Sequence, residues 1–205
     1  MKLKGLCSSN ESIGHYTMIV FKDKGKWSII CDDNKLDIID SNVQLHNKKL
    51  DKEKFRRELK KKFKKKLKKR NAEIILDLVK NAMLQKHGTM IVILERAKKE
   101  MKRLRSTGYK VKYNNIMNRY IEQITAIDGA VLVNLNGDIV GIGVILDGES
   151  SDKCGINNSR GARYNSAIKY TYTRNRKGDK CIVVVISEDG DISIIENGKE
   201  INADK

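Results

Sequence analysis

Three short polar segments in the second half of the chain carry residue types that could bind a phosphorylated ligand. The first begins at Asp128, which stands directly before an apolar run that predicts a strand over 130–135. Gly129 and Ala130 follow it with almost no side chain, so a ligand could approach the backbone beside the carboxylate. Asp-Gly is also a common turn sequence, and taken alone the segment favours that simpler interpretation.

The second segment runs from Arg160 through Asn165 and opens a predicted helix over 162–176. The first turn of a helix has free N–H groups and the positive end of the helix dipole, both of which favour phosphate. Gly161 lets the backbone come close to a ligand, and Arg160 and Arg163 can add charge-assisted hydrogen bonds. Ordinary helix capping with two surface arginines explains the same residues equally well.

The third segment is Ser187-Glu188, which follows an apolar strand predicted over 181–186. Polar residues at the end of a buried strand commonly line the ligand site of an α/β fold. A simple turn accounts for them just as well, so each of the three segments is a weak signal by itself.

Buried strands and intervening helices must position these segments. Continuous apolar runs predict strands over 89–94, 130–135, 139–145, 181–186 and 192–195. Helices are predicted between them over 97–105, 113–124 and 162–176. We therefore expect an α/β fold with a mixed, mostly central twisted β-sheet flanked by helices. Asn136-Gly137 predicts a type I′ hairpin turn, and Asn197-Gly198 a further turn.

The first 80 residues look different from the rest. Strands over 16–21 and 26–31, joined by Asp-Lys-Gly, predict an N-terminal β-hairpin. Beyond residue 51, Phe55, Leu59, Phe63 and Leu67 recur every four residues with Lys and Arg between them. This period predicts a long basic amphipathic helix or two consecutive ones. The expected organisation is a hairpin extension over 1–50, a basic helix over 51–80 and the main domain over 81–205.

The net charge of +16 is concentrated in one segment. Lys48–Arg70 holds 15 Lys/Arg and 3 Asp/Glu, a net of +12. Such a segment can bind nucleic acid non-specifically through phosphate contacts. It has no interleaved Tyr, Trp or Gly for stacking on bases, and a solvated helix face is the simpler explanation.

Composition argues against several other classes. The four cysteines form no Cys-x-x-Cys pair, so neither a zinc site nor a disulfide framework is indicated. The first ten residues have no apolar core of a signal peptide, and no apolar run approaches the roughly 18 residues that span a bilayer. The expectation is a cytoplasmic protein with reduced thiols and no membrane association.

Taken together and in order, the segments resemble the diadenylate cyclase (DAC) domain family, the nucleotide-binding domain type of the DNA-integrity-scanning protein. The resemblance covers residues from about 82 to 195. The pieces that carry it are His-Gly-Thr-Met-Ile-Val-Ile-Leu-Glu at 87–95, Ile-Asp-Gly-Ala-Val-Leu-Val at 127–133, Ile-Gly-Val-Ile-Leu-Asp-Gly at 142–148, Arg-Gly-Ala-Arg-Tyr-Asn-Ser-Ala at 160–167 and Val-Val-Val-Ile-Ser-Glu-Asp-Gly at 183–190.

The resemblance implies an enzyme that joins two ATP molecules into cyclic di-AMP, releases two pyrophosphates and uses Mg²⁺ or Mn²⁺. Each protomer would hold one ATP, and two protomers would associate face to face. It also implies three catalytic residues: Asp128 beside the ribose 3′-hydroxyl, Arg163 on phosphate, and Glu188 near the triphosphate. Asp128 and Glu188 would bind the metal.

The remaining site residues implied by the resemblance would contact the nucleotide. Gly129 and Ala130 would do so through backbone, Leu146 would lie near the adenine, and Ser187 near the triphosphate. The phosphate side would also include Arg160, Gly161, Tyr164 and Asn165.

One motif departs from the family. The usual sequence there is Arg-His-Arg, whereas this chain has Arg163-Tyr164-Asn165, a form we associate with a divergent branch. Losing one charged hydrogen bond to phosphate costs about 1.5–3 kcal/mol of binding, which Arg160 or a lysine could offset. Two hypotheses therefore stay open: an active cyclase, and a nucleotide- or cyclic-dinucleotide-binding sensor that turns over weakly or not at all.

Overall fold

The computed structural model describes residues 17–31, 34–39, 42–45, 50–84, 87–111, 120–151, 153–157, 160–188 and 190–201. The chain divides into two compact units, Met1–Lys48 and Lys49–Lys205. The basic helical segment, which the sequence separates from the main domain, thus lies in the same compact unit as residues 81–205.

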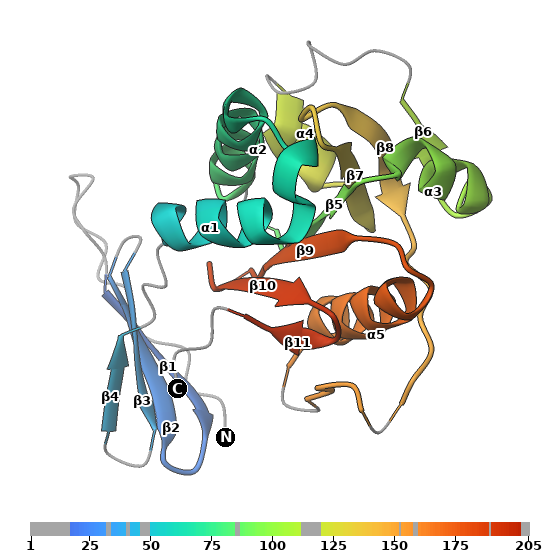
Figure 1. Cartoon of the computed structure of the whole chain (residues 1–205). Coiled ribbons are helices and arrows are strands. Elements are labelled where there is room, and N and C mark those ends of the chain that lie inside the picture. The colour runs from blue at the N-terminus through green and yellow to red at the C-terminus, as the bar shows by residue number, and fades with distance from the viewer. Residues whose placement is uncertain are drawn as a thin grey trace. The chain divides into compact units, whose positions relative to one another are not determined.

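The first unit is a small antiparallel sheet (Figure 1). Strands β1 (Thr17–Asp23) and β2 (Lys26–Cys31) form the expected hairpin. Phe21 lies opposite Trp27 across this hairpin, and their rings stack with centroids 6.3 Å apart. Two further strands, β3 (Asn34–Ile39) and β4 (Asn42–Leu45), extend the sheet in the order β1-β2-β3-β4.

The second unit is built on a mixed sheet whose described strands run in the order β11-β10-β9-β5-β7-β8-β6. Their bounds are β5 Thr89–Leu94, β6 Tyr109–Lys110, β7 Ala130–Asn134, β8 Ile139–Val144, β9 Cys181–Ile186, β10 Ile192–Glu196 and β11 Lys199–Glu200. Strands β5 and β7 pair in parallel, and the other neighbours pair antiparallel. This arrangement confirms the expected mixed α/β fold.

Helices cover both faces of this sheet. They are α1 Lys52–Phe63, α2 Lys69–Ala82, α3 Ala97–Arg103, α4 Ile121–Thr125 and α5 Ala162–Arg176. Helix α5 has the bounds that the sequence predicts. Of the helix expected over 113–124, residues 113–119 lie outside the described residues, and α4 covers its end.

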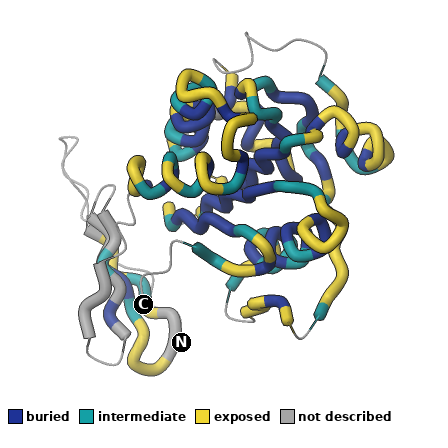
Figure 2. The backbone as a smooth tube through the Cα atoms, in the orientation of Figure 1, coloured by how far each residue is buried: buried dark blue, intermediate teal, exposed yellow. Residues whose placement is uncertain are grey.

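Alternation along the central strands produces two cores. In β5, Ile91 and Ile93 join α1, α2 and α4 in one cluster, while Met90, Val92 and Leu94 join α3 and α5 in the other. All six residues of β5 and all six of β9 are buried, and Figure 2 shows these central strands in dark blue. Strands buried on both faces explain the continuous apolar runs in the sequence.

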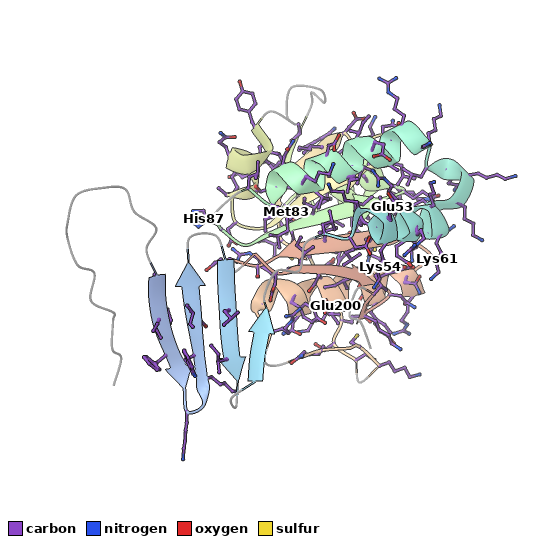
Figure 3. All side chains as sticks on the ribbon, turned by 90° about the vertical axis from the view of Figure 1, so that its left-hand side faces the viewer. Glu53, Lys54, Lys61, Met83, His87 and Glu200 are labelled. Atoms are coloured by element: carbon purple, nitrogen blue, oxygen red, sulfur yellow. The ribbon has the colours of Figure 1, made fainter. Side chains whose placement is uncertain are left out.

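The basic segment is two helices joined by a 3-10 turn, not one long helix. The Asp51 side chain caps α1 by accepting from the Lys54 N–H at 2.9 Å. Phe55, Leu59 and Phe63 are fully buried, whereas Lys61, labelled in Figure 3, is exposed. The turn over Lys64–Lys66 separates α1 from α2. The four-residue apolar period therefore anchors α1 in the core and leaves Lys52, Lys60 and Lys61 exposed, while Lys62 is largely buried and pairs with Glu196 at 2.8 Å.

The predicted type I′ turn at Asn136-Gly137 is wrong in detail. The strands do form a hairpin, but only Gly137 has a positive φ, of 85°. The Asn134 side chain accepts the N–H groups of Asn136 and Asp138 at 2.8 and 3.0 Å and so sets the turn instead. In the hairpin between β10 and β11, Asn197 and Gly198 both have positive φ.

Candidate functional site

A pocket of about 580 Å³ lies where the end of β9 meets the beginning of α5. It brings together residues from all three polar segments of the sequence. The lining consists of Asp128, Arg160, Gly161, Ala162, Arg163, Tyr164, Val185, Ile186, Ser187, Glu188, Asp191 and Ser193.

Arg163 joins the two carboxylates of the pocket. Its Nη2 lies 3.5 Å from Oδ1 of Asp128, and its Nη1 lies 3.6 Å from Oε1 of Glu188. Both carboxylates are well exposed, at 89% and 68% of the side chain. Ion pairs this long and this exposed contribute little free energy. A phosphate group could therefore replace the carboxylates as the partner of the guanidinium with little loss of stability.

Gly88 makes room for this guanidinium. A Cβ on Gly88 would lie 2.9 Å from Nη1 of Arg163 and 3.3 Å from the carbonyl oxygen of Ile186. A side chain at this position would therefore displace Arg163 from its place between the two carboxylates.

The backbone at Gly129 places Asp128 just before the start of β7. Gly129 has φ +105°, and its N–H donates to the Asp128 carboxylate at 3.0 Å. A Cβ here would lie 2.5 Å from the carbonyl carbon of Gly143, so only glycine fits. Gly129 and Ala130 are both buried, and neither lines the pocket.

Arg160 forms a fixed wall of the pocket. Its Nη2 donates to Ser193 Oγ at 2.7 Å and lies 3.4 Å from Oε2 of Glu200, which is labelled in Figure 3. The guanidinium carbon stands 4.8 Å from the centre of the Tyr164 ring. Burial, and then the negative charge of Glu200, raises the pKa of Tyr164, so its hydroxyl stays protonated near neutral pH.

Asn165 faces the preceding loop. Its Oδ1 accepts from the Asn157 N–H at 3.0 Å, and its Nδ2 donates to the carbonyl oxygens of Asn157 and Arg160 at 2.9 and 3.1 Å. Asn165, the third residue of the Arg-Tyr-Asn motif, therefore holds the loop that leads into α5 by hydrogen bonds.

Ser187 is held in the tight turn between β9 and β10. Its N–H donates to the Asp191 carbonyl oxygen at 2.9 Å, and its Oγ accepts from the Asp191 N–H at 3.0 Å. The turn leaves Glu188 exposed at the rim of the pocket.

Seven of the sequence-predicted residues line the pocket: Asp128, Arg160, Gly161, Arg163, Tyr164, Ser187 and Glu188. Four do not: Gly129, Ala130, Leu146 and Asn165. Leu146 packs instead against the core cluster that includes α5.

Sequence reasoning missed several contributors. Asp191 and Ser193 line the pocket because β9 and β10 form a hairpin. Glu200 reaches Arg160 from β11, and no local sequence pattern marks it. Gly88 stands before a buried strand, which is a usable signal for close backbone packing.

No group of three or more His, Cys, Asp or Glu side chains is arranged to hold a metal ion among the residues that the structure describes. Asp128 and Glu188 are two carboxylates on either side of Arg163. That donor set suits Mg²⁺ or Mn²⁺ shared with substrate, because Mg²⁺ is usually bound through one or two carboxylates together with phosphate oxygens and waters. In the described part of the chain, no helix is both long enough and apolar enough to cross a bilayer.

Two solved structures are similar to this chain over part of its length. DacA from Staphylococcus aureus, in a double-mutant form, is 21% identical with a TM-score of 0.49, covering 62% of this chain and 84% of that one. A hypothetical membrane spanning protein from Bacillus cereus is 26% identical with a TM-score of 0.49. That match covers 63% of this chain and 61% of the other, so less than two thirds of the Bacillus cereus chain is represented. No protein of curated function matches.

A family model gives the assignment. The model described as DisA bacterial checkpoint controller nucleotide-binding (DAC) matches residues 76–200. The match runs from the second half of α2 to the end of β11 and so includes every residue that lines the pocket. Because it spans more than half of the chain, the protein belongs to the DAC family of nucleotide-binding domains.

Proposed function

We propose that this protein is a diadenylate cyclase that condenses two ATP molecules into cyclic di-AMP and releases two pyrophosphates. The observation that carries the proposal is the position of Arg163 between the carboxylates of Asp128 and Glu188, at the mouth of a pocket large enough for a nucleotide. Family membership supplies the reaction class.

The phosphate end of the substrate would lie at the start of α5. Gly161 is the N-cap of this helix and makes no side-chain capping bond, and a Cβ there would meet nothing within 4 Å. Backbone N–H groups of the first turn are therefore accessible to phosphate oxygens. Arg163 would add a charged, forked donor, while Arg160 shapes the wall from its anchor on Ser193.

The reacting hydroxyl would lie at Asp128. Its carboxylate accepts from the Gly129 N–H, lies 3.5 Å from Arg163, and is well exposed to solvent. From this position it can accept a hydrogen bond from the ribose 3′-hydroxyl and draw its proton during attack on the α-phosphorus of a second ATP. Positioning and charge neutralisation are the main demands of such phosphoryl-type transfer.

A divalent cation, Mg²⁺ or Mn²⁺, would bind to Asp128 and Glu188 together with the triphosphate. When bound, it would neutralise charge on the phosphates and lower the pKa of a coordinated hydroxyl. The exposure of both carboxylates also fits a reaction in which a second protomer presents its own ATP face to face.

A sensor that binds nucleotide or cyclic dinucleotide without turnover is the second candidate. Asn165 favours it, because its amide is fully engaged with the loop backbone and adds no cation to the phosphate side. Under this candidate function the pocket binds the same class of ligand but does not catalyse the cyclisation.

Mass spectrometry of products tests the first candidate. The full chain at high concentration is incubated with each of the four nucleoside triphosphates and Mn²⁺, beside Asp128→Asn and the matched control Asp77→Asn. Asp77 is an exposed carboxylate on α2, outside the pocket. Cyclic di-AMP from wild type and Asp77→Asn but not from Asp128→Asn supports the cyclase. If no cyclic dinucleotide forms from any of the four triphosphates, the cyclase proposal is wrong.

Calorimetric titration tests whether the pocket binds nucleotide at all, which both candidate functions require. Binding of a non-hydrolysable ATP analogue or cyclic di-AMP without turnover supports the sensor. If neither ligand binds, both candidates are wrong.

A further inference from the structure

A second pocket, of about 630 Å³, lies at the other end of α5 and β9 from the first. We call it the distal basic pocket. Its lining holds eight basic and two acidic side chains beside one leucine: Leu94, Arg96, Lys99, Glu100, Lys102, Arg103, Arg105, Arg174, Lys177, Asp179 and Lys180.

The two acidic groups are already neutralised. Glu100 accepts hydrogen bonds from Arg103 at 2.6 Å and from the Tyr170 hydroxyl at 2.9 Å, and it lies 3.2 Å from Arg174. Asp179 lies within 4 Å of both Arg96 and Arg174. The positive charge of the remaining side chains is therefore not cancelled within the pocket.

Five basic groups of the lining make no ion pair with a described residue: Lys99, Lys102, Arg105, Lys177 and Lys180. Lys99 and Lys102 lie on α3 and Arg105 just after it, whereas Lys177 and Lys180 lie between the end of α5 and the start of β9. The end of α5 reaches α3 here through Arg174 and Glu100, which are 3.2 Å apart. Figure 1 shows both helices. Positive side chains thus converge on one concave site from two directions.

Arg174 adds a buried donor to this pocket. Its side chain is 4% exposed, its Nη1 pairs with Glu100 and Asp179, and its Nε is buried without a hydrogen-bond partner among the described residues. Buried donors are normally satisfied. The described residues therefore supply no acceptor for this Nε, which leaves one buried donor in a side chain that lines the pocket.

We propose that the distal basic pocket binds a small polyphosphate anion, such as inorganic pyrophosphate, inorganic triphosphate or the triphosphate group of a nucleotide. Its volume falls within the range of small-ligand sites. Forked guanidinium groups and lysine ammonium groups are the usual partners of phosphate oxygens. Nucleic acid needs charges spread along an extended backbone, whereas these converge on one cavity.

Calorimetric titration of the full chain with inorganic triphosphate, without metal, tests this site at 150 mM salt. Two sites are expected in the wild type, and Arg163→Ala is expected to weaken one of them by about 10- to 150-fold. In that Arg163→Ala background, the pair Lys99→Glu/Lys177→Glu is expected to weaken the remaining site at least tenfold. The neutral pair Lys99→Ala/Lys177→Ala should weaken it less, in the same direction.

The matched control is Lys98→Glu/Arg176→Glu. These exposed residues neighbour Lys99 and Lys177, lie outside the lining, and change the net charge by the same amount. Because salt screens charges that do not touch the anion, the control should weaken triphosphate binding clearly less than Lys99→Glu/Lys177→Glu does.

Three outcomes overturn the proposal. The first is an equal loss in the control pair, which would indicate diffuse attraction to a basic surface. The second is the absence of triphosphate binding in Arg163→Ala, which would leave only the first pocket. The third is binding of a DNA or RNA oligonucleotide that depends on Lys99 and Lys177 while triphosphate does not bind.

Discussion

The side-chain amide of Asn165 forms a two-way hydrogen-bond pair with the backbone of Asn157, accepting from its N–H at 3.0 Å and donating to its carbonyl oxygen at 2.9 Å. This pair ties the loop before α5 to the first turn of the helix. It gives the departure from the Arg-His-Arg motif a structural role, since an arginine could not make both bonds.

Restoring the family residue with Asn165→Arg is expected to harm the protein. The variant loses the hydrogen bonds to Asn157 and Arg160. It should lower the free energy of unfolding by about 1–3 kcal/mol and weaken ATP binding. Chemical denaturation and calorimetry measure the two effects, with Asn81→Arg on the exposed face of α2 as control. Tighter ATP binding at unchanged stability would show that the loop does not depend on Asn165.

Arg163→Ala is expected to weaken binding of an ATP analogue by about 10- to 150-fold, which corresponds to about 1.5–3 kcal/mol for one charged hydrogen-bonding group. Arg163→Lys should fall between this variant and wild type, because a lysine keeps the charge without the fork. Arg176→Ala, at the far end of α5, is the control. Calorimetric affinities equal to wild type in all three variants would remove Arg163 from the phosphate site.

Gly129→Ala is expected to destabilise the domain strongly, because a Cβ there combines φ +105° with a 2.5 Å approach to Gly143. Gly178→Ala isolates the backbone effect, since Gly178 has φ +76° and open space around its Cβ. The control should cost about 1–2 kcal/mol, and Gly129→Ala clearly more. Denaturation midpoints compare them, and similar midpoints would mean that β7 and β8 can move apart.

The buried carboxylate of Glu100 should make stability depend on acidic pH. Burial alone would raise the pKa of Glu100, but hydrogen bonds from Arg103 and Tyr170 and the charge of Arg174 outweigh it and hold this pKa below its usual 4.5. The stabilisation is therefore complete above pH 4.5 and is lost as the pH falls through the lower pKa of the folded state.

Glu100→Gln is expected to lower the free energy of unfolding at pH 7 by about 3 kcal/mol, as when one partner of a buried ion pair is removed. The difference from wild type should shrink as the pH falls below 4.5. Denaturation curves at several pH values measure this, with the exposed Asp77→Asn as control. A difference that stays constant down to acidic pH would show that Glu100 is not ionised in the folded protein.

Much of the fold follows from local sequence patterns. Apolar runs identify the central strands, and the polar loop ending at Gly161 marks the start of α5. These features can be predicted because a strand or helix is recognised by the spacing of its own apolar residues. The same patterns also select Asp128, Arg163 and Glu188 as candidates, each weak alone.

Only the tertiary structure decided how those candidates are arranged. Asp128 and Arg163 are 35 positions apart in the sequence. They meet because β7 and β9 belong to one sheet and α5 packs against it. Asn165 bonds to the loop before α5, and Glu200 pairs with Arg160, through contacts that no local pattern encodes. The sequence determined the elements and the residue types, whereas long-range packing and hydrogen bonding determined which of them share a pocket.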